Sequence, residues 1–270
     1  MMPNRLSLFL IACLWGSVVG LPSSPLRAAS PAEETAAAPL RVLLVTGGCC
    51  HDYRKQIELI RGLESRLGAV AWTVAQYDDQ RNTKADIYND PAWAEPYDLV
   101  IHNECFGGVE DGAFVSQIVE GHVQAGVPAV AIHCTMHSYR AAPTADTWRA
   151  FLGVTSRRHE RSKRSLHVVP VAPEHPIMAS FPKAWDTPNG ELYVIEKVWP
   201  TAQVLANTFS KEEERDMPVV WTNEYQGVRL FGTTLGHHNE TIADPVWMDT
   251  VTAGIRWALG EAAAQSASGK

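Results

Sequence analysis

The chain has 270 residues, of which 46% are apolar and 20% are charged, so it can bury a sizeable core as one large domain or two small ones. Its 17 Pro and 19 Gly residues are ordinary for this length and exclude a disordered or collagen-like chain. The formal net charge of −7 argues against a nucleic-acid-binding surface.

Residues 1–29 have the order of parts of a secretory signal peptide. Arg5 precedes an uncharged, mostly apolar stretch over 6–21, and small residues suited to signal peptidase follow at 28–30. The stretch is slightly long, which leaves an uncleaved anchor open. Leu10–Cys13 also fits a lipobox, but the apolar run continues past the cysteine. We therefore expect a periplasmic or extracellular protein without a lipid anchor and with no membrane span after the signal.

The apolar pattern then predicts one main domain over residues 40–260, between a polar linker at 30–39 and a flexible tail at 261–270. Short, continuously apolar runs alternate with helical patterns in its first half. This order predicts a flavodoxin-like, doubly wound α/β fold with a mostly parallel sheet covered on both faces. The expected strands are 41–46, 70–77, 97–102 and 127–133, and the expected helices are 53–67 and 113–124.

After about residue 153 the pattern changes to short β-like runs separated by turn signals. We expect these runs to form a β-rich C-terminal extension, followed by a last helix over 245–259. The runs are 165–171, 192–196, 203–209, 218–224 and 228–234.

Four cysteines remain after the signal: Cys49, Cys50, Cys105 and Cys134. An even number in an exported chain is compatible with disulfides. Adjacent cysteines rarely pair without strain, however. The favoured interpretation is that most of these residues are small buried hydrophobes, and their pairing stays open.

Histidines mark four predicted strand ends, at His51, His102, His133 and His237. Ligands of open α/β sheets bind outside the carboxyl ends of the strands, so these ends predict one polar cluster. Gly47 and Gly48 before His51 would let backbone approach a ligand closely, which favours a functional role there. His102 fits a hydrogen-bonded strand residue. His122, in the middle of a predicted helix, is expected at the surface.

His133 is the sharpest candidate because it ends a buried strand abruptly, as a nucleophile elbow does. Cys134 follows it, but the flanking glycines of Gly-x-Cys-x-Gly are missing, which disfavours thiol catalysis. A metal is the other interpretation. His133 and His137 could place two imidazoles together, and Glu191 or Glu240 could complete a zinc or manganese site.

Together these residues resemble the ThuA-like family, named for trehalose utilisation and built on a class I glutamine amidotransferase-like fold. The similarity runs from about Leu40 to Gly260. Two positions depart from the family pattern: Gly190 replaces an aspartate, and a basic run replaces the Phe of Phe-x-x-His. The matching segments are Val45–Gly48 with His51, Ile132–His133, Arg158–Glu160, His175–Ile177, Glu191–Tyr193, Pro218–Trp221 and Leu235–His237.

The resemblance implies a role in sugar metabolism, beside enzymes that make 3-keto sugars, and a site without the amidotransferase triad. We expect isomerisation, elimination or hydrolysis of a sugar or 3-keto-glycoside by acid–base chemistry. His133 and His51 are the expected acid and base, with Glu191 orienting them or sharing the proton. The expected substrate-binding residues are His159, Trp221 and His237.

Two alternatives stay open: a non-catalytic carbohydrate-binding protein, and a metal-dependent hydrolase with zinc or manganese. The sequence does not name the sugar, and a homo-oligomer is also open.

Overall fold

The computed structural model describes residues 38–77 and 80–261. The predicted signal peptide at 1–29, most of the linker and nearly all of the tail lie outside these residues. Within them, no helix is long and apolar enough to cross a bilayer.

Five parallel strands form one half of a nine-stranded sheet. The two central strands β1 and β3 are buried along almost their whole length, as expected for apolar runs with helices on both faces. The predicted strands are thus confirmed, with shifted ends. In spatial order the strands are β2 (Val70–Tyr77), β1 (Leu40–Gly48), β3 (Leu99–Cys105), β4 (Ala129–Ile132) and β11 (Val228–Thr233).

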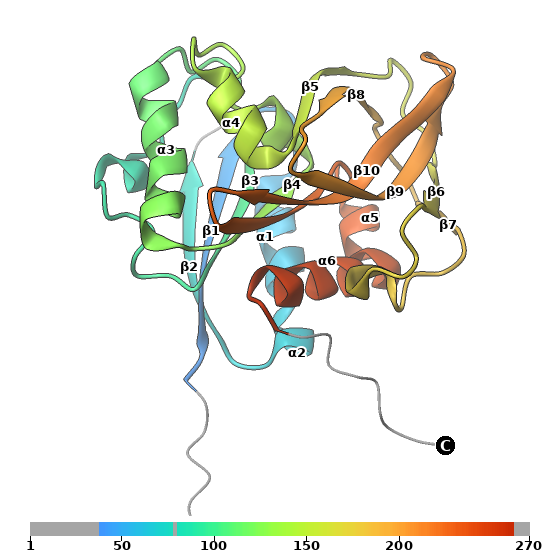
Figure 1. The fold of residues 1–270 in the computed structure, drawn as a ribbon, viewed down its shortest axis with the longest axis horizontal. Helices are drawn as coiled ribbons and strands as arrows, with labels where there is room; N and C mark the ends of the chain where they lie inside the picture. The colour runs from blue at the N-terminus through green and yellow to red at the C-terminus, as the bar shows by residue number, and fades with distance from the viewer. Residues whose placement is uncertain (1–37, 78–79, 262–270) are drawn as a thin grey trace, which may run out of the picture. The chain divides into compact units, whose positions relative to one another are not determined.

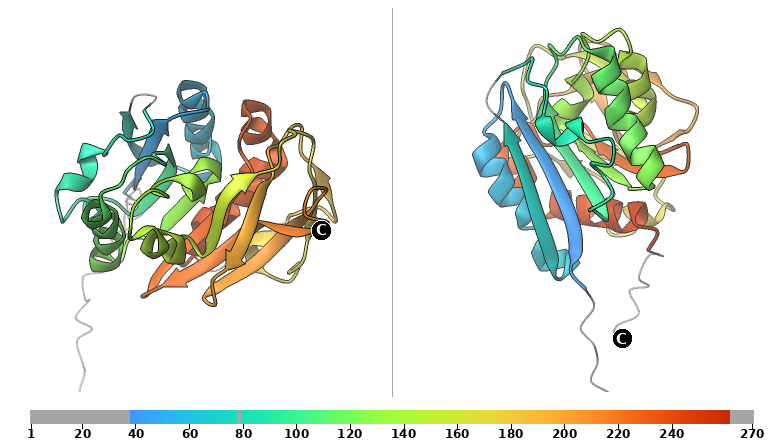
Figure 2. Two further views of the ribbon diagram at one scale, coloured as in Figure 1. Left: turned by 90° about the horizontal axis from the view of Figure 1, so that it is seen from above. Right: turned by 90° about the vertical axis from the view of Figure 1, so that its left-hand side faces the viewer.

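Helices cover both faces of this sheet (Figure 1). Figure 2 shows α3 and α4 on one face and α1, α5 and α6 on the other. Asp52, Asp111 and Asp244 cap α1, α3 and α6 by accepting backbone N–H hydrogen bonds. The helices are α1 (Tyr53–Arg61), α2 (Glu64–Leu67), α3 (Gly112–Ala125), α4 (Ala145–Leu152), α5 (Asn239–Ala243) and α6 (Pro245–Ala258), with 3₁₀ turns η1 (Asp86–Asn89), η2 (His133–His137) and η3 (Pro176–Met178).

The β-rich C-terminal region continues the same sheet rather than forming a separate layer. Beyond β11 the strands run antiparallel, in the order β10 (Arg215–Tyr225), β9 (Ala202–Ser210), β6 (His167–Pro170) and β7 (Trp185–Asp186). A separate two-stranded antiparallel sheet pairs β5 (Val154–His159) with β8 (Tyr193–Val198). The flavodoxin-like α/β fold with a β-rich extension is confirmed.

Trp221, expected to contact substrate, is part of the core. Its side chain is fully buried on β10, and its indole N–H donates to the Leu152 carbonyl oxygen at 2.7 Å. The ring packs over Gly232, where an added Cβ would lie 2.3 Å from ring carbons. The prediction of a sugar-stacking role was wrong because β10 turns this residue into the sheet's packed face.

A buried polar network lies between α3 and β3. His102 Nδ1 is 2.9 Å from a carboxylate oxygen of Glu104, and His102 Nε2 is 2.9 Å from His122 Nε2. His122 Nδ1 reaches the Val127 carbonyl oxygen at 2.7 Å and therefore carries a proton there. All three titratable side chains are fully buried. The expectation of a surface position for His122 was wrong, since the helix turns it toward His102.

Candidate functional site

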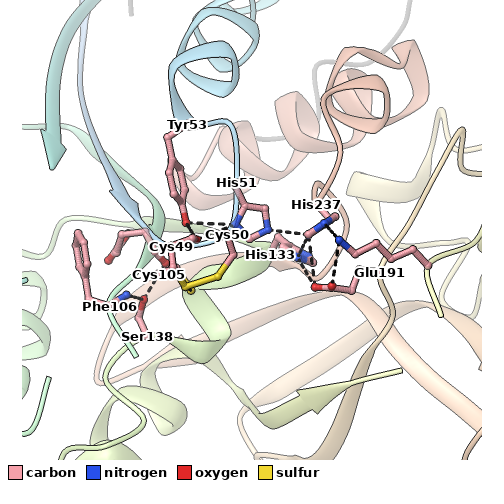
Figure 3. Close-up of a disulfide and its surroundings, with 12 residues drawn as sticks. Cys49, Cys50, His51, Tyr53, Cys105, Phe106, His133, Ser138, Glu191 and His237 are labelled. Atoms are coloured by element: carbon pink, nitrogen blue, oxygen red, sulfur yellow. Dashed lines mark hydrogen bonds and ion pairs between the residues drawn. A yellow bond between two sulfur atoms is a disulfide. The ribbon is translucent and has the colours of Figure 1, made fainter. Parts of the chain in front are cut away.

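The carboxyl ends of β1, β4 and β11 bring three distant histidines together. His51 follows β1, His133 follows β4 and His237 follows β11. Figure 3 shows the three imidazoles pointing toward one another, with Glu191 beside them. The clustering expected from the strand ends is therefore present for these three, whereas His102 points into the buried network.

The imidazole nitrogens lie within hydrogen-bond distance of one another. His51 Nε2 is 2.7 Å from His237 Nδ1, and His237 Nδ1 is 3.2 Å from His133 Nε2. One ring nitrogen from each residue falls within 4.8 Å of the other two. His133 is buried, and the other two are partly accessible from the cavity. Three nitrogen atoms thus face one small volume.

Glu191 completes the cluster from the loop before β8. One carboxylate oxygen, Oε2, lies 3.3 Å from His133 Nε2 and 3.4 Å from His237 Nδ1. The other, Oε1, lies 3.7 Å from His159 Nδ1 and 3.8 Å from Lys163 Nζ. Because only 7% of this side chain is exposed, its negative charge acts mainly on these four groups.

The contacts assign several of the protons. His133 Nδ1 is 2.6 Å from the Thr234 carbonyl oxygen and must donate to it. The contact between His133 Nε2 and Glu191 is attractive only with a proton between them. Lys163 donates to His237 Nε2 at 2.6 Å, so a neutral His237 carries its proton on Nδ1. From Nδ1, a neutral His237 therefore donates to His51 Nε2, which lies 2.7 Å away.

The pKa values follow from burial and mutual repulsion. Burial, together with the charges of His133 and His237, lowers the pKa of His51 to about 2. Burial and His133 lower the pKa of His237 to about 3. Burial acts to raise the pKa of Glu191, but the hydrogen bond from His133 and the nearby imidazoles outweigh it and lower that pKa to about 2. Near neutral pH the cluster therefore holds an ionised carboxylate and two uncharged imidazoles.

The backbone is strained where the chain enters the site. His133 has a φ of +41°, which a side chain other than glycine rarely adopts. This fits the predicted elbow at His133. Gly47 and Gly48 also have positive φ, but an added Cβ would meet the carbonyl oxygens of Tyr77 and Cys105 at 2.3 Å. These glycines are needed for close strand packing, a reason different from the ligand approach that was expected.

Cys49 and Cys50 form a disulfide at the edge of the cluster (Figure 3). The pairing that the sequence left open is thus settled for these two adjacent cysteines, where Cys50 adopts a φ of +87°. Cys105 and Cys134 are free and buried, as expected. Burial raises the pKa of the Cys134 thiol well above its ordinary value, which agrees with the prediction that it is no nucleophile.

A cavity of about 390 Å³ opens beside the cluster, a volume that suits a small ligand such as a monosaccharide. His159, expected to bind substrate, lines it and is exposed. Tyr193 also lines it, with its ring 4.3 Å from that of His133. The sequence did not single out Tyr193 or Lys163 as site residues, although Tyr193 ends the family segment Glu191–Tyr193 and Lys163 lies in the basic run.

His137 does not join His133 as a metal ligand pair. Its Nε2 is 3.0 Å from Ser156 Oγ, and its ring stacks on Tyr193. Residues 133–137 form a 3₁₀ turn, in which positions i and i+4 differ by about 120° around the axis rather than sharing a face as in an α-helix. The imidazoles that lie beside His133 are instead those of His51 and His237.

An open α/β sheet with a cleft at the carboxyl ends of its parallel strands defines this chain as a flavodoxin-like α/β protein. Its sequence matches the model of the ThuA family, described as trehalose utilisation, over residues 41–258. The chain belongs to this family. No curated protein matches the chain.

Solved structures share the fold at low sequence identity. A protein described as ThuA-like from Parabacteroides merdae has 18% identity and a TM-score of 0.67, over 85% of this chain and 93% of its own. Another from Bacteroides uniformis has 17% identity and a TM-score of 0.62, over 85% and 95%. A protein from Thermoplasma acidophilum described as part of a GMP synthase has 11% identity and a TM-score of 0.51, over 83% and 96%. The last comparison supports the amidotransferase-like fold.

Proposed function

We propose that this chain processes a carbohydrate, with proton transfer to or from the sugar by the His133–Glu191 pair. The family suggests a carbohydrate-related role, as its description is trehalose utilisation. The observation that carries the chemistry is the contact between the buried Nε2 of His133 and a carboxylate oxygen of Glu191, which lie 3.3 Å apart. Such a pair can give and take a proton at one position. The substrates we propose are a sugar or a 3-keto-glycoside.

His51 takes a different role from the base expected from the sequence. An imidazole with a pKa of about 2 is a weak base at neutral pH. A neutral imidazole can instead donate or accept a hydrogen bond at a sugar carbonyl or hydroxyl oxygen, because it stays uncharged through the reaction. We assign this polarising role to His51 and His237, and proton transfer to His133 with Glu191.

The test is turnover of a panel of sugars and 3-keto-glycosides by the parent chain and by Glu191→Gln. The amide keeps the shape of the side chain but cannot share the proton, so kcat should fall about 10²- to 10⁴-fold. Glu240→Gln is the matched control, since Glu240 is exposed at the neighbouring rim and contacts no member of the cluster within the described residues. Binding without turnover in the parent would instead support a carbohydrate-binding protein.

The three converging nitrogens favour a metal-dependent hydrolase as the second candidate. Tetrahedral zinc with bonds of about 2.0–2.1 Å holds its ligand atoms about 3.3–3.4 Å apart. The Glu191 contacts of 3.3 and 3.4 Å match this spacing, and the His237–His133 distance of 3.2 Å is close to it, whereas the His51–His237 distance of 2.7 Å is shorter. His133 Nδ1 and His51 Nδ1 face backbone carbonyl oxygens, as zinc-binding histidines commonly do.

A donor set of three imidazoles and one carboxylate suits zinc better than manganese. A bound zinc ion would supply a Lewis acid for a sugar oxygen. Elemental analysis of the purified chain and of His133→Ala tests this candidate. Near-stoichiometric zinc that His133→Ala loses would support it, whereas metal-free, folded and active protein would overturn it.

We also propose that the chain is exported and that residues 1–29 are removed. N-terminal sequencing of protein from the producing cells should begin at Ser30. A chain that retains Met1 would contradict cleavage.

A further inference from the structure

The walls of the cavity carry far more positive than negative charge. Of its described lining residues, five are cationic side chains and one is a carboxylate, Glu191. The chain as a whole has a net charge of −7, so the basic lining is a local feature rather than the average of the surface. The cationic residues are Arg81, Arg140, Arg157, Arg158 and Lys163.

Two of these cations are already paired outside the cavity. Arg157 lies 3.4 Å from Glu196, which does not line the cavity. Arg158 forms an ion pair with Glu213, which lines the neighbouring hollow. Their charges are partly neutralised, which leaves them less able to hold a ligand anion.

Arg140 is the cation best placed to meet a ligand. Its Nη1 donates to the Arg157 carbonyl oxygen at 3.3 Å, and no carboxylate of the described residues lies within ion-pair distance of its guanidinium. The side chain lies over Gly107, where an added Cβ would approach Arg140 Nε to 3.2 Å. This packing and the hydrogen bond hold the half-buried guanidinium in place. A preorganised guanidinium loses little entropy when it binds an oxyanion.

The positive charges of Arg140 and Arg81 act on Cys105, another residue that lines the cavity. The pKa of the Cys105 thiol is lowered, first by its hydrogen bond with Cys134 and then by Arg140 and Arg81. Lys163 lies on the other side, with Nζ 2.6 Å from His237 Nε2. Arg140 and Glu191 line the same cavity, so a small ligand with its anionic group at Arg140 can also meet the carboxylate that contacts His133.

We infer that this cavity binds an anionic sugar, whose carboxylate or phosphate is held by Arg140 with Arg81. The inference rests on the proposed carbohydrate function and names the class of its substrate. A neutral sugar would leave the guanidinium of Arg140 without an acidic partner. An oxyanion would accept two charge-assisted hydrogen bonds from one guanidinium.

The test is calorimetric titration of the full chain with glucuronate, glucose 6-phosphate, glucose and inorganic phosphate. Each acidic sugar that fits should bind about ten- to a hundredfold more tightly than glucose, the range expected for a hydrogen bond to a charged group. The tighter of the two acidic sugars identifies the group as carboxylate or phosphate. The preference should weaken as salt is raised, because these cations are partly exposed.

Arg140→Gln should remove most of this preference, and Arg81→Gln should reduce it. The second variant keeps the test decisive if the first folds poorly. Arg54→Gln is the matched control, since Arg54 is exposed on α1 and does not line the cavity. Equal binding of glucose and both acidic sugars by the parent, or an unchanged preference in both variants, would overturn the inference.

Inorganic phosphate separates this inference from the proposed function. Phosphate bound by the parent and lost in Arg140→Gln would support the anion site even if no sugar bound, an outcome that would count against the carbohydrate role. Glucose bound as tightly as the acidic sugars would leave the carbohydrate role standing and refute the anion site. No binding of any anion would also refute it.

Discussion

The stability of this fold should fall steeply as the pH is lowered from 7 to 5. The folded-state pKa values of four buried or half-buried histidines lie far below the ordinary value of 6.5: about 2 for His51 and about 3 for His122, His137 and His237. Between these values and 6.5 the unfolded chain binds more protons than the folded chain. Stability is therefore fully present above pH 6.5 and is lost as the pH falls below it.

The size of the loss follows from the proton linkage. A histidine with a pKa near 6.5 unfolded and 3 or less folded costs about 2 kcal/mol of stability between pH 7 and pH 5. Four such residues cost up to about 8 kcal/mol, which is comparable with the whole stability of a typical domain, about 5–15 kcal/mol. Burial is the largest cause for each of them.

Urea unfolding followed by tryptophan fluorescence at pH 7, 6 and 5 measures this loss. His51→Asn removes one titrating imidazole, so its unfolding free energy should fall about 2 kcal/mol less than that of the parent between pH 7 and 5. Tyr53→Phe is the control, because it removes a hydroxyl 3.3 Å from His51 Nδ1 without removing an imidazole. An identical pH dependence in parent and His51→Asn would refute the reasoning.

Three further outcomes are expected. His122→Ala should lower the unfolding free energy by about 3 kcal/mol in urea titrations, because it leaves a cavity and a buried donor without its partner; a loss below about 0.5 kcal/mol would contradict the buried network. Peptide mapping without reductant should find Cys49 joined to Cys50, and free thiols at both positions would contradict the disulfide. Gly232→Ala should cost about 1–3 kcal/mol and shift the tryptophan emission, since the methyl group would press on the Trp221 ring; unchanged emission and stability would contradict that packing.

The fold was predictable because its first half consists of local signals. Continuous apolar strands and helical spacing specify β1 and α3 within a few residues, whereas the single helix expected over 53–67 is divided into α1 and α2. The same strand ends predicted that His51, His133 and His237 would meet. By contrast, the sheet continues without a break from β11 into β10, and this depends on pairing between strands that local sequence does not specify.

The remaining errors concern the direction in which individual side chains point. The sequence around Trp221 has the same β-strand pattern whether its ring faces a ligand or the core. The ring packs in the core because Gly232, on the neighbouring strand, leaves room for it. His137 was placed by assuming an α-helix where the chain forms a 3₁₀ turn. His122 was placed at the surface because its partner His102 is 20 residues away and on another element. Glu191 was one of two carboxylates proposed as metal ligands, and the resemblance gave it an orienting role, but local sequence does not place it beside histidines more than 30 residues away.

The central claim is that the His133–Glu191 pair transfers a proton to or from a sugar. The most direct measurement is the exchange of solvent deuterium into a 3-keto-glycoside at the carbon next to the carbonyl group, followed by NMR in D₂O. Exchange reports proton transfer even when no net product forms. We predict exchange above the buffer rate with the parent chain and its loss in His133→Gln. Exchange at the buffer rate in parent and variant alike, with the ligand bound to both, would contradict the claim.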